Sequence, residues 1–181
     1  MRNELRSPDD KPSPAPQAYN WGVWHTNMVA AANMINAANP NILIFYSGLN
    51  FDTTLEPIVS GSDLGNGVRF QKSSFAYSNK IVLEIHNYQN SATSCDSMKS
   101  GLQNNAFKAL TASGNSAMPV VLTEFGFNQG DNSYSGVYAS CLRTYIPSLK
   151  AGWTVWVLSG SYYIRSGTQD YEETWGKSQF V

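Results

Sequence analysis

Pro119-Val-Val-Leu-Thr-Glu124-Phe-Gly126 is a short apolar run that begins at a proline and ends in a carboxylate followed by a glycine. Three further runs of similar length are rich in β-branched or aromatic residues and are bounded by Gly, Pro, Asn or Ser; they cover residues 42–47, 81–86 and 153–158. Runs of this kind are typical of buried strands. The sequence therefore predicts four short strands, of which 119–124 is the third.

Around these strands, apolar residues recur at three- and four-residue steps, as they do along one face of a helix. The stripes cover residues 21–35, 98–110 and 134–149. Asn39-Pro40 is expected to end the first helix and Gly114 to cap the second, whereas Pro147 weakens the last turn of the third. The strand starts lie about 33 to 39 residues apart. Strand–helix–strand units of that length predict parallel strands covered by helices, which is an α/β fold.

Two stretches lack a regular apolar pattern and are predicted to be irregular loops. Residues 7–17 contain four prolines, and residues 49–80 are rich in serine and glycine. Within the second stretch, Ser62-Asp-Leu-Gly-Asn-Gly67 is typical of turns and does not match a phosphate-binding loop.

The composition argues against several classes of protein. The 181 residues carry a formal charge of −1, so neither a nucleic-acid partner nor a polybasic membrane anchor is expected. No run approaches the roughly 18 apolar residues of a membrane span, and no apolar segment of signal-peptide type follows Met1. Charged residues make up 14%, whereas aromatic residues reach 13% and Ser and Asn are abundant. This balance favours an extracellular protein that handles neutral polar ligands such as sugars.

Two glutamates are candidate catalytic groups. Glu124 ends a predicted parallel strand, and barrel and open α/β folds place their sites at that end of the sheet. Glu4 stands beside Asn3 and between two arginines. A strand-end glutamate also serves in many proteins as a helix cap or a salt-bridge partner, so neither residue identifies a reaction alone.

Aromatic and imidazole side chains accompany these carboxylates. His86 and Tyr88 lie two residues apart at the end of their strand and should share one face, and Trp156 lies late on the last strand. The alternatives are a hydrogen-bonded interior layer for His86 and Tyr88 and a core position for Trp156. Glu84 has the parity of His86, so it is expected to point inward as structural support.

Together these residues form a more specific pattern than any of them alone. Retaining glycoside hydrolysis needs one protonated carboxyl group, which donates to the leaving oxygen, and one ionised carboxylate, which attacks the anomeric carbon. Different surroundings hold the two pKa values apart. A tryptophan supplies an apolar face for the sugar ring, and histidine and tyrosine orient the nucleophile and the sugar hydroxyls.

These motifs resemble the C-terminal half of a fungal-type member of glycoside hydrolase family 5, the cellulase family. Arg2-Asn3-Glu4 resembles the Asn-Glu motif that ends the fourth strand of that family, and His86-Asn-Tyr88 resembles its sixth-strand motif. Thr123-Glu124-Phe125-Gly126 resembles the seventh-strand motif, and Trp156 falls at the eighth-strand tryptophan. Segments 47–49, 51–52 and 160–163 are also similar to a fungal and plant branch of the family.

The resemblance implies a role for each of these residues. Glu4 would be the acid/base and Glu124 the nucleophile, while Asn3 would bind the sugar 2-hydroxyl. His86 and Tyr88 would support the reaction, and Trp156 would stack under the ring. The implied substrate is a β-linked oligo- or polysaccharide such as cellulose or β-glucan, hydrolysed without a cofactor, and the family is extracellular.

The resemblance also implies an incomplete fold. Residues 1–181 would form a partial (β/α)8 TIM barrel, running from the end of strand four through strand eight. Such a half-barrel is expected to need the missing N-terminal half and to be weakly active or inactive alone. Two alternatives remain: a different specificity, such as β-mannan or β-1,3-glucan, and a non-catalytic carbohydrate-binding remnant.

Two cysteines bear on whether the protein is secreted. Cys95 and Cys141 fall on helices that would be neighbours around a barrel, so they are expected either to form a disulfide, which suits a secreted protein, or to remain buried thiols. The sequence has no CxxC motif and no histidine cluster, so no metal site is expected.

Overall fold

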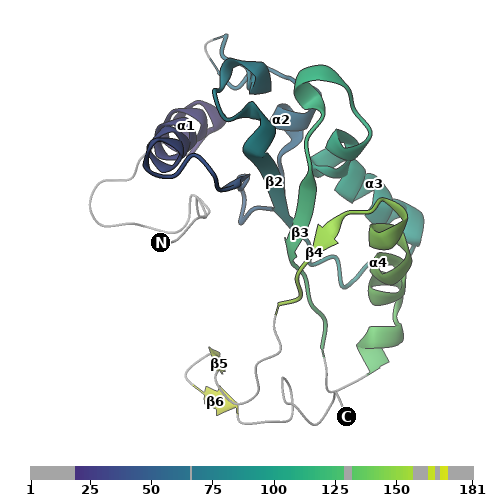
Figure 1. The fold of residues 1–181 in the computed structure, drawn as a ribbon. Helices are drawn as coiled ribbons and strands as arrows, with labels where there is room; N and C mark the ends of the chain where they lie inside the picture. The colour runs from purple at the N-terminus through teal and green to yellow at the C-terminus, as the bar shows by residue number, and fades with distance from the viewer. Residues whose placement is uncertain (1–18, 66, 129–131, 157–162, 166–167, 171–181) are drawn as a thin grey trace.

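The computed structural model describes residues 19–65, 67–128, 132–156, 163–165 and 168–170 (Figure 1). Its centre is a four-stranded sheet of order β1-β2-β3-β4, in which all neighbouring strands are parallel. The strands are β1 (Ile44–Tyr46), β2 (Ile81–His86), β3 (Val120–Glu124) and β4 (Gly152–Trp153). The α-helices are α1 (Trp21–Ala38), α2 (Glu56–Ser60), α3 (Cys95–Asn105) and α4 (Val137–Ser148). A separate antiparallel pair is formed by β5 (Tyr163–Arg165) and β6 (Thr168–Asp170).

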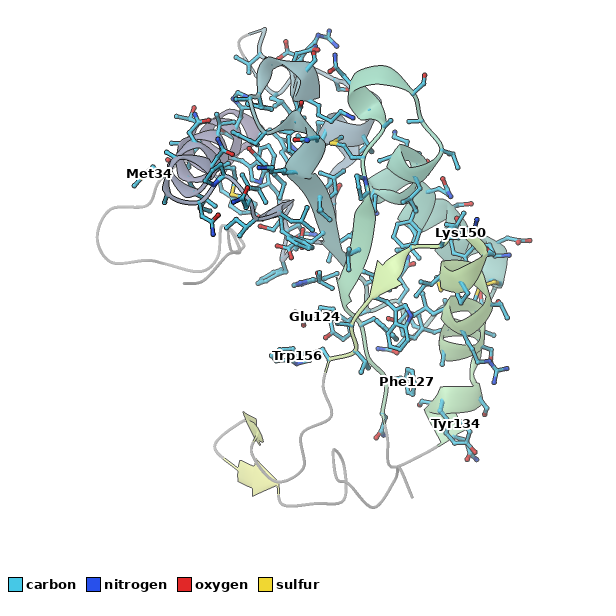
Figure 2. The ribbon with its side chains drawn as sticks, viewed as in Figure 1. Met34, Glu124, Phe127, Tyr134, Lys150 and Trp156 are labelled. Atoms are coloured by element: carbon cyan, nitrogen blue, oxygen red, sulfur yellow. A yellow bond between two sulfur atoms is a disulfide. The ribbon has the colours of Figure 1, made fainter. Side chains whose placement is uncertain are left out.

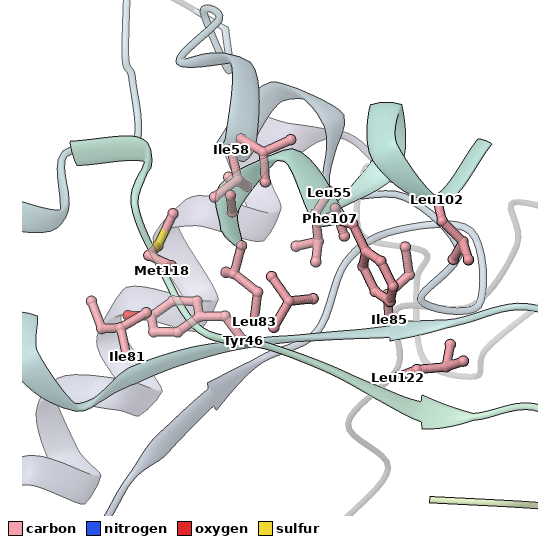
Figure 3. Packing of buried hydrophobic residues seen from close by; sticks show 14 of the residues in the cluster. Tyr46, Leu55, Ile58, Ile81, Leu83, Ile85, Leu102, Phe107, Met118 and Leu122 are labelled. Carbon is pink, nitrogen blue, oxygen red and sulfur yellow. The ribbon is translucent and has the colours of Figure 1, made fainter. Parts of the chain in front are cut away.

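One face of the sheet carries the hydrophobic core. Alternate residues of the strands, such as Tyr46, Leu83 and Leu122, are buried together with side chains of the helical segments, such as Leu102 and Phe107 (Figure 3). Figure 1 shows α1 at one end of the sheet and α3 and α4 at the other. Burying this apolar surface is the main stabilising contribution to the fold.

The opposite face of the sheet is less covered. Phe45 lies between two buried residues of β1 and is 43% exposed, while Glu84, Val121 and Thr123 are half-buried. Because side chains alternate along a strand, these residues face away from the helix-covered core. Glu84 therefore lies on the same face as His86, as its parity predicts.

The first helix matches its prediction in its start and its end. The Asn20 side chain accepts a hydrogen bond from the Val23 amide (2.9 Å), which caps α1 at its N-terminus. The helix ends at Ala38 because Asn39 is extended before Pro40. β2 also has its predicted bounds, 81–86.

Other elements differ from the predictions. The stretch 49–80 is not entirely irregular: it contains α2 and two 3-10 turns at 72–74 and 78–80. Elements of three to five residues are too short to show a helical repeat, which explains why the sequence pattern missed them. The predicted loop 7–17 lies outside the described residues.

The second and third helices are shorter than predicted. Gly114 does not cap the second helix: α3 ends at Asn105, a 3-10 turn follows at 107–110, and Gly114 begins a further 3-10 turn. Apolar residues on both segments face one core, so their stripe reads as one continuous helix. The third helix begins at Val137, and Tyr134, where the predicted helix starts, lies in the 3-10 turn that precedes it.

β1 and β4 are also shorter than predicted. β4 covers two residues, although Thr154 donates to the Leu122 carbonyl (2.9 Å) and Trp156 to the Phe125 carbonyl (2.7 Å), so the chain stays beside β3. Residues 157 and 158 of the predicted strand lie outside the described part.

A disulfide joins Cys95, the first residue of α3, to Cys141 in α4, with their Cα atoms 5.5 Å apart. No helix in the described ranges is both long and apolar enough to cross a membrane.

Candidate active site

Polar and aromatic side chains gather where the parallel strands end. Glu124 is the last residue of β3 and His86 the last of β2, and the two are register partners next to a local irregularity at Ile85/His86. Tyr88 and Trp156 follow β2 and β4. Figure 2 shows the Glu124 and Trp156 side chains at this end of the sheet, on the side away from α4.

The Glu124 carboxylate is held through both of its oxygens. The Tyr88 hydroxyl donates to Oε1 at 2.7 Å, and His86 Nδ1 lies 3.2 Å from Oε2. The Glu124 side chain is partly exposed, so it remains accessible from the solvent side. Tyr88 and His86 therefore restrict the rotamer of Glu124, while the carboxylate stays open to solvent.

His86 lies between two carboxylates. Its Nε2 atom is 3.7 Å from Oδ2 of Asp52, a residue only 1% exposed, and its backbone amide donates to the Asp52 carbonyl (2.7 Å). The Gly48 amide donates to the other carboxylate oxygen of Asp52. Asp52 thus contacts the Nε2 edge of the imidazole ring, whereas Glu124 contacts its Nδ1 edge.

Asp52 was not identified as a site residue from the sequence. It reaches His86 because Asn50, Phe51 and Asp52 all have positive φ, at 56°, 57° and 60°. Each non-glycine residue in this left-handed region costs about 1 kcal/mol or more. Strain of this kind persists where the surrounding structure enforces it, and it clusters at functional sites. The available sequence signals were an acidic residue in the loop after a strand and the similarity of residues 51–52 to the family that the motifs resemble.

Two exposed aromatic side chains flank the carboxylate. Tyr88 and Trp156 are each 43% exposed, so each presents a ring to solvent beside Glu124. A sugar ring offers an apolar face that packs against such aromatics. The site thus combines a fixed carboxylate with a platform suited to neutral polar rings.

The other predicted site residues are placed as follows. Asn3 and Glu4 lie outside the described residues, so the structure does not relate them to Glu124. Within the described ranges, no group of three or more His, Cys, Asp or Glu side chains is arranged to hold a metal ion.

The sequence matches the family described as Cellulase (glycosyl hydrolase family 5) over residues 1–161. A similar protein is a glycosyl hydrolase 5 family protein from Chamaecyparis obtusa, which is 30% identical over 194 aligned residues. That alignment covers 97% of this chain and 30% of the relative.

Solved structures of similar fold include the native form of a β-glucanase from Saccharophagus degradans, with a TM-score of 0.58, 19% identity and coverage of 87% of this chain and 44% of that chain. Another is the mannotriose complex of a Thermomonospora fusca β-mannanase, with a TM-score of 0.51, 19% identity and coverage of 79% and 41%. The chain therefore spans less than half the length of these relatives. At this level of identity the similarity shows the fold, and it confirms the prediction of a partial (β/α)8 barrel.

Proposed function

Since the chain belongs to glycosyl hydrolase family 5, we propose that it carries half of a retaining glycoside hydrolase site that cleaves β-linked polysaccharide. The observation that carries the proposal is the double support of Glu124, by the Tyr88 hydroxyl at 2.7 Å and by His86 at 3.2 Å. The Tyr88 hydroxyl donates to one oxygen of Glu124 and His86 contacts the other, so the two partners hold the carboxyl group in one orientation.

Glu124 is the nucleophile in this proposal. One carboxylate oxygen attacks the anomeric carbon, and the bond to the leaving sugar oxygen breaks as that oxygen receives a proton. The product is a covalent glycosyl-enzyme ester. Water then attacks the same carbon and releases Glu124, so the two inversions give net retention of configuration.

Glu4 is the acid/base, because it follows Asn3 in the segment that resembles the family's fourth-strand motif. It gives its proton to the leaving oxygen in the first step and removes a proton from water in the second. Retaining enzymes hold the two carboxyl groups about 5 to 5.5 Å apart, so the proposal requires Glu4 to reach that distance from Glu124. Asn3 then binds the 2-hydroxyl of the sugar.

Trp156 and Tyr88 form the binding platform. Trp156 stacks under the ring whose anomeric carbon faces Glu124, and its exposure leaves that face open. The substrate class is β-linked glucan or mannan, since the relatives with this fold are named a β-glucanase and a β-mannanase. An extracellular location suits such a substrate.

Completion of the barrel is part of the proposal. β1 and β4 are the end strands of the described sheet, and Phe45 of β1 is 43% exposed on the face that points away from the helices. A further set of strands that pairs with these edges would cover this face and supply the rest of the cleft. The site is therefore expected to be most active together with that remaining half.

A mechanism-based label tests the function directly. A 2-deoxy-2-fluoro glycosyl fluoride of cellobiose slows hydrolysis of the ester, so it is expected to attach to Glu124 and be located there by peptide mass spectrometry. Glu124→Gln, which keeps the shape of the side chain, is the matched control and should remain unlabelled. Product analysis by NMR on β-glucan, β-mannan and β-1,3-glucan is expected to show the β-anomer first. Binding of oligosaccharide with no label and no turnover would favour the carbohydrate-binding remnant instead.

A further inference from the structure

Tyr138 connects the two loops that carry the candidate active site. It is the second residue of α4 and is almost fully buried. Its hydroxyl donates to the Asn87 carbonyl and accepts a hydrogen bond from the Gly126 amide. A phenol has one proton to donate, and here that proton and an oxygen lone pair are used on two different loops.

Both partners are adjacent to the proposed catalytic groups. Asn87 lies between His86 and Tyr88, and its amide donates to the Glu124 carbonyl at 3.0 Å. Gly126 follows Glu124 by two residues. A shift of the Tyr138 hydroxyl would therefore move the Tyr88 loop relative to Glu124.

Gly126 also packs against Trp156 and Tyr88, the two aromatic residues of the proposed binding platform. A Cβ atom added at Gly126 would lie 2.2 Å from the Trp156 carbonyl oxygen and 3.7 Å from Cε1 of Tyr88. The Trp156 backbone and the Tyr88 ring thus pack directly against Gly126, whose amide also donates to the Tyr138 hydroxyl. Only glycine allows such a close approach at this position.

The helix that carries Tyr138 is itself tied to the same segment. Cys141 lies three residues further along α4, about one turn away, and its disulfide partner Cys95 begins α3, shortly after the Tyr88 loop. α4 is therefore attached near Asn87 by a hydrogen bond and at Cys95 by a covalent bond. This double attachment limits how far Tyr138 can move.

We infer that Tyr138 is a positioning residue, whose hydroxyl sets the distance between the Tyr88 loop and the Glu124 strand end. The inference rests on the proposed function for its catalytic consequence. Burial raises the pKa of Tyr138, so the hydroxyl remains a neutral donor at the pH values at which glycosidases work. Loss of the hydroxyl leaves the Asn87 carbonyl and the Gly126 amide without this partner. A misplacement of about 1 Å at a reacting group lowers the rate about a hundredfold.

The test compares Tyr138→Phe with Tyr145→Phe in the full chain. Tyr145 lies on the same helix, and its hydroxyl accepts a hydrogen bond from Gln103 Nε2 (2.5 Å) in α3, away from the loops. The sequence has two histidines, so the imidazole NMR signals of His86 are readily assigned with His25→Gln. We expect Tyr138→Phe to move the His86 signals and to lower kcat about tenfold to a hundredfold while KM changes little. Tyr145→Phe should leave both unchanged.

The outcomes separate this inference from the proposed function. A chain that hydrolyses no glycoside in any variant, even when combined with a polypeptide that supplies the remaining half of the barrel, but in which only Tyr138→Phe moves the His86 signals, refutes the function and supports the positioning role. Unchanged His86 signals and unchanged kcat in a folded Tyr138→Phe variant overturn the inference. If that variant does not fold, 3-fluorotyrosine at position 138 keeps the hydroxyl and strengthens it as a donor. The His86 signals are then expected to move, unlike with the same substitution at position 145, and equal spectra overturn the inference.

Discussion

His86 Nδ1 lies 3.2 Å from Glu124 Oε2, so the last residues of two neighbouring strands contact each other through their side chains. The other nitrogen of the same ring faces buried Asp52 at 3.7 Å. This row of Asp52, His86 and Glu124 links a strained turn after β1 to the end of β3. How much this row contributes to catalysis depends on how firmly each of the three side chains is held in position.

Asp52→Asn is expected to reduce activity without unfolding the protein. The amide is similar in shape but carries no charge, so it holds the imidazole less firmly and allows it to rotate away from Glu124. We expect kcat to fall about tenfold to a hundredfold, with a small change in KM. Steady-state kinetics on a soluble β-glucan measure this. Asp63→Asn, in an exposed turn, is the matched control; equal kinetics in both variants would show that Asp52 has no role in the site.

Trp156→Ala is expected to weaken binding of oligosaccharide. Removing an aromatic surface that stacks on a sugar ring costs about 1 to 1.5 kcal/mol, or about tenfold in Kd. Isothermal titration with cellotetraose measures the change in the Glu124→Gln background, where no turnover occurs. Trp153→Ala is the control, since Trp153 packs edge-to-face on Phe125 in an apolar pocket against α4. A larger loss in the control than in Trp156→Ala would place the sugar elsewhere.

Removal of the disulfide is expected to lower the stability of the fold. The bond links Cys95 to Cys141 across a separation of 46 residues. A cross-link of that span lowers the conformational entropy of the unfolded chain, which stabilises the folded state by about 2 to 4 kcal/mol. For a chain of this size, each kcal/mol corresponds to about 2 to 4 °C in Tm. Calorimetry of Cys95→Ser/Cys141→Ser measures the loss. Dithiothreitol should lower the Tm of the native sequence and leave that of the double variant unchanged.

The native state is expected to lose stability in alkaline solution. Burial raises the pKa of Tyr46 and Tyr138, and the hydrogen bond with Tyr77 raises that of Tyr46 further. A phenol with a raised pKa binds its proton more tightly in the folded than in the unfolded state. Its contribution is fully present below the ordinary pKa of about 10 and is lost as the pH rises above that value.

Urea unfolding at pH values from 8 to 11 measures this loss. Tyr46→Phe removes one of the two phenols, so its stability should fall less steeply above pH 10, although it starts lower because the contact with the Tyr77 hydroxyl (3.1 Å) is absent. A slope equal to that of the native sequence would mean that Tyr46 ionises alike in both states.

The sequence pattern predicted the parts of this fold that depend on local periodicity. Residues 81–86 form a short apolar run rich in β-branched residues, which predicts a strand. The residues at its end and at the end of 119–124 are candidates because parallel strands direct their carboxyl ends to one edge. The same reasoning failed for α2, which is too short to repeat, and for Gly114, because two successive short helices bury one continuous stripe.

Local pattern alone thus specified strand parity, the first helix with its ends, and the residues Glu124, His86, Tyr88 and Trp156 as strand-end groups. Tertiary structure decided which distant polar atoms meet. Asp52 reaches His86 across a separation of 34 through three consecutive left-handed residues, and Tyr138 contacts Asn87 across a separation of 51. Periodicity records which side of an element is buried, because burial depends on the average surroundings of a face. It carries no information on hydrogen-bond partners, whose distances depend on how separate elements pack.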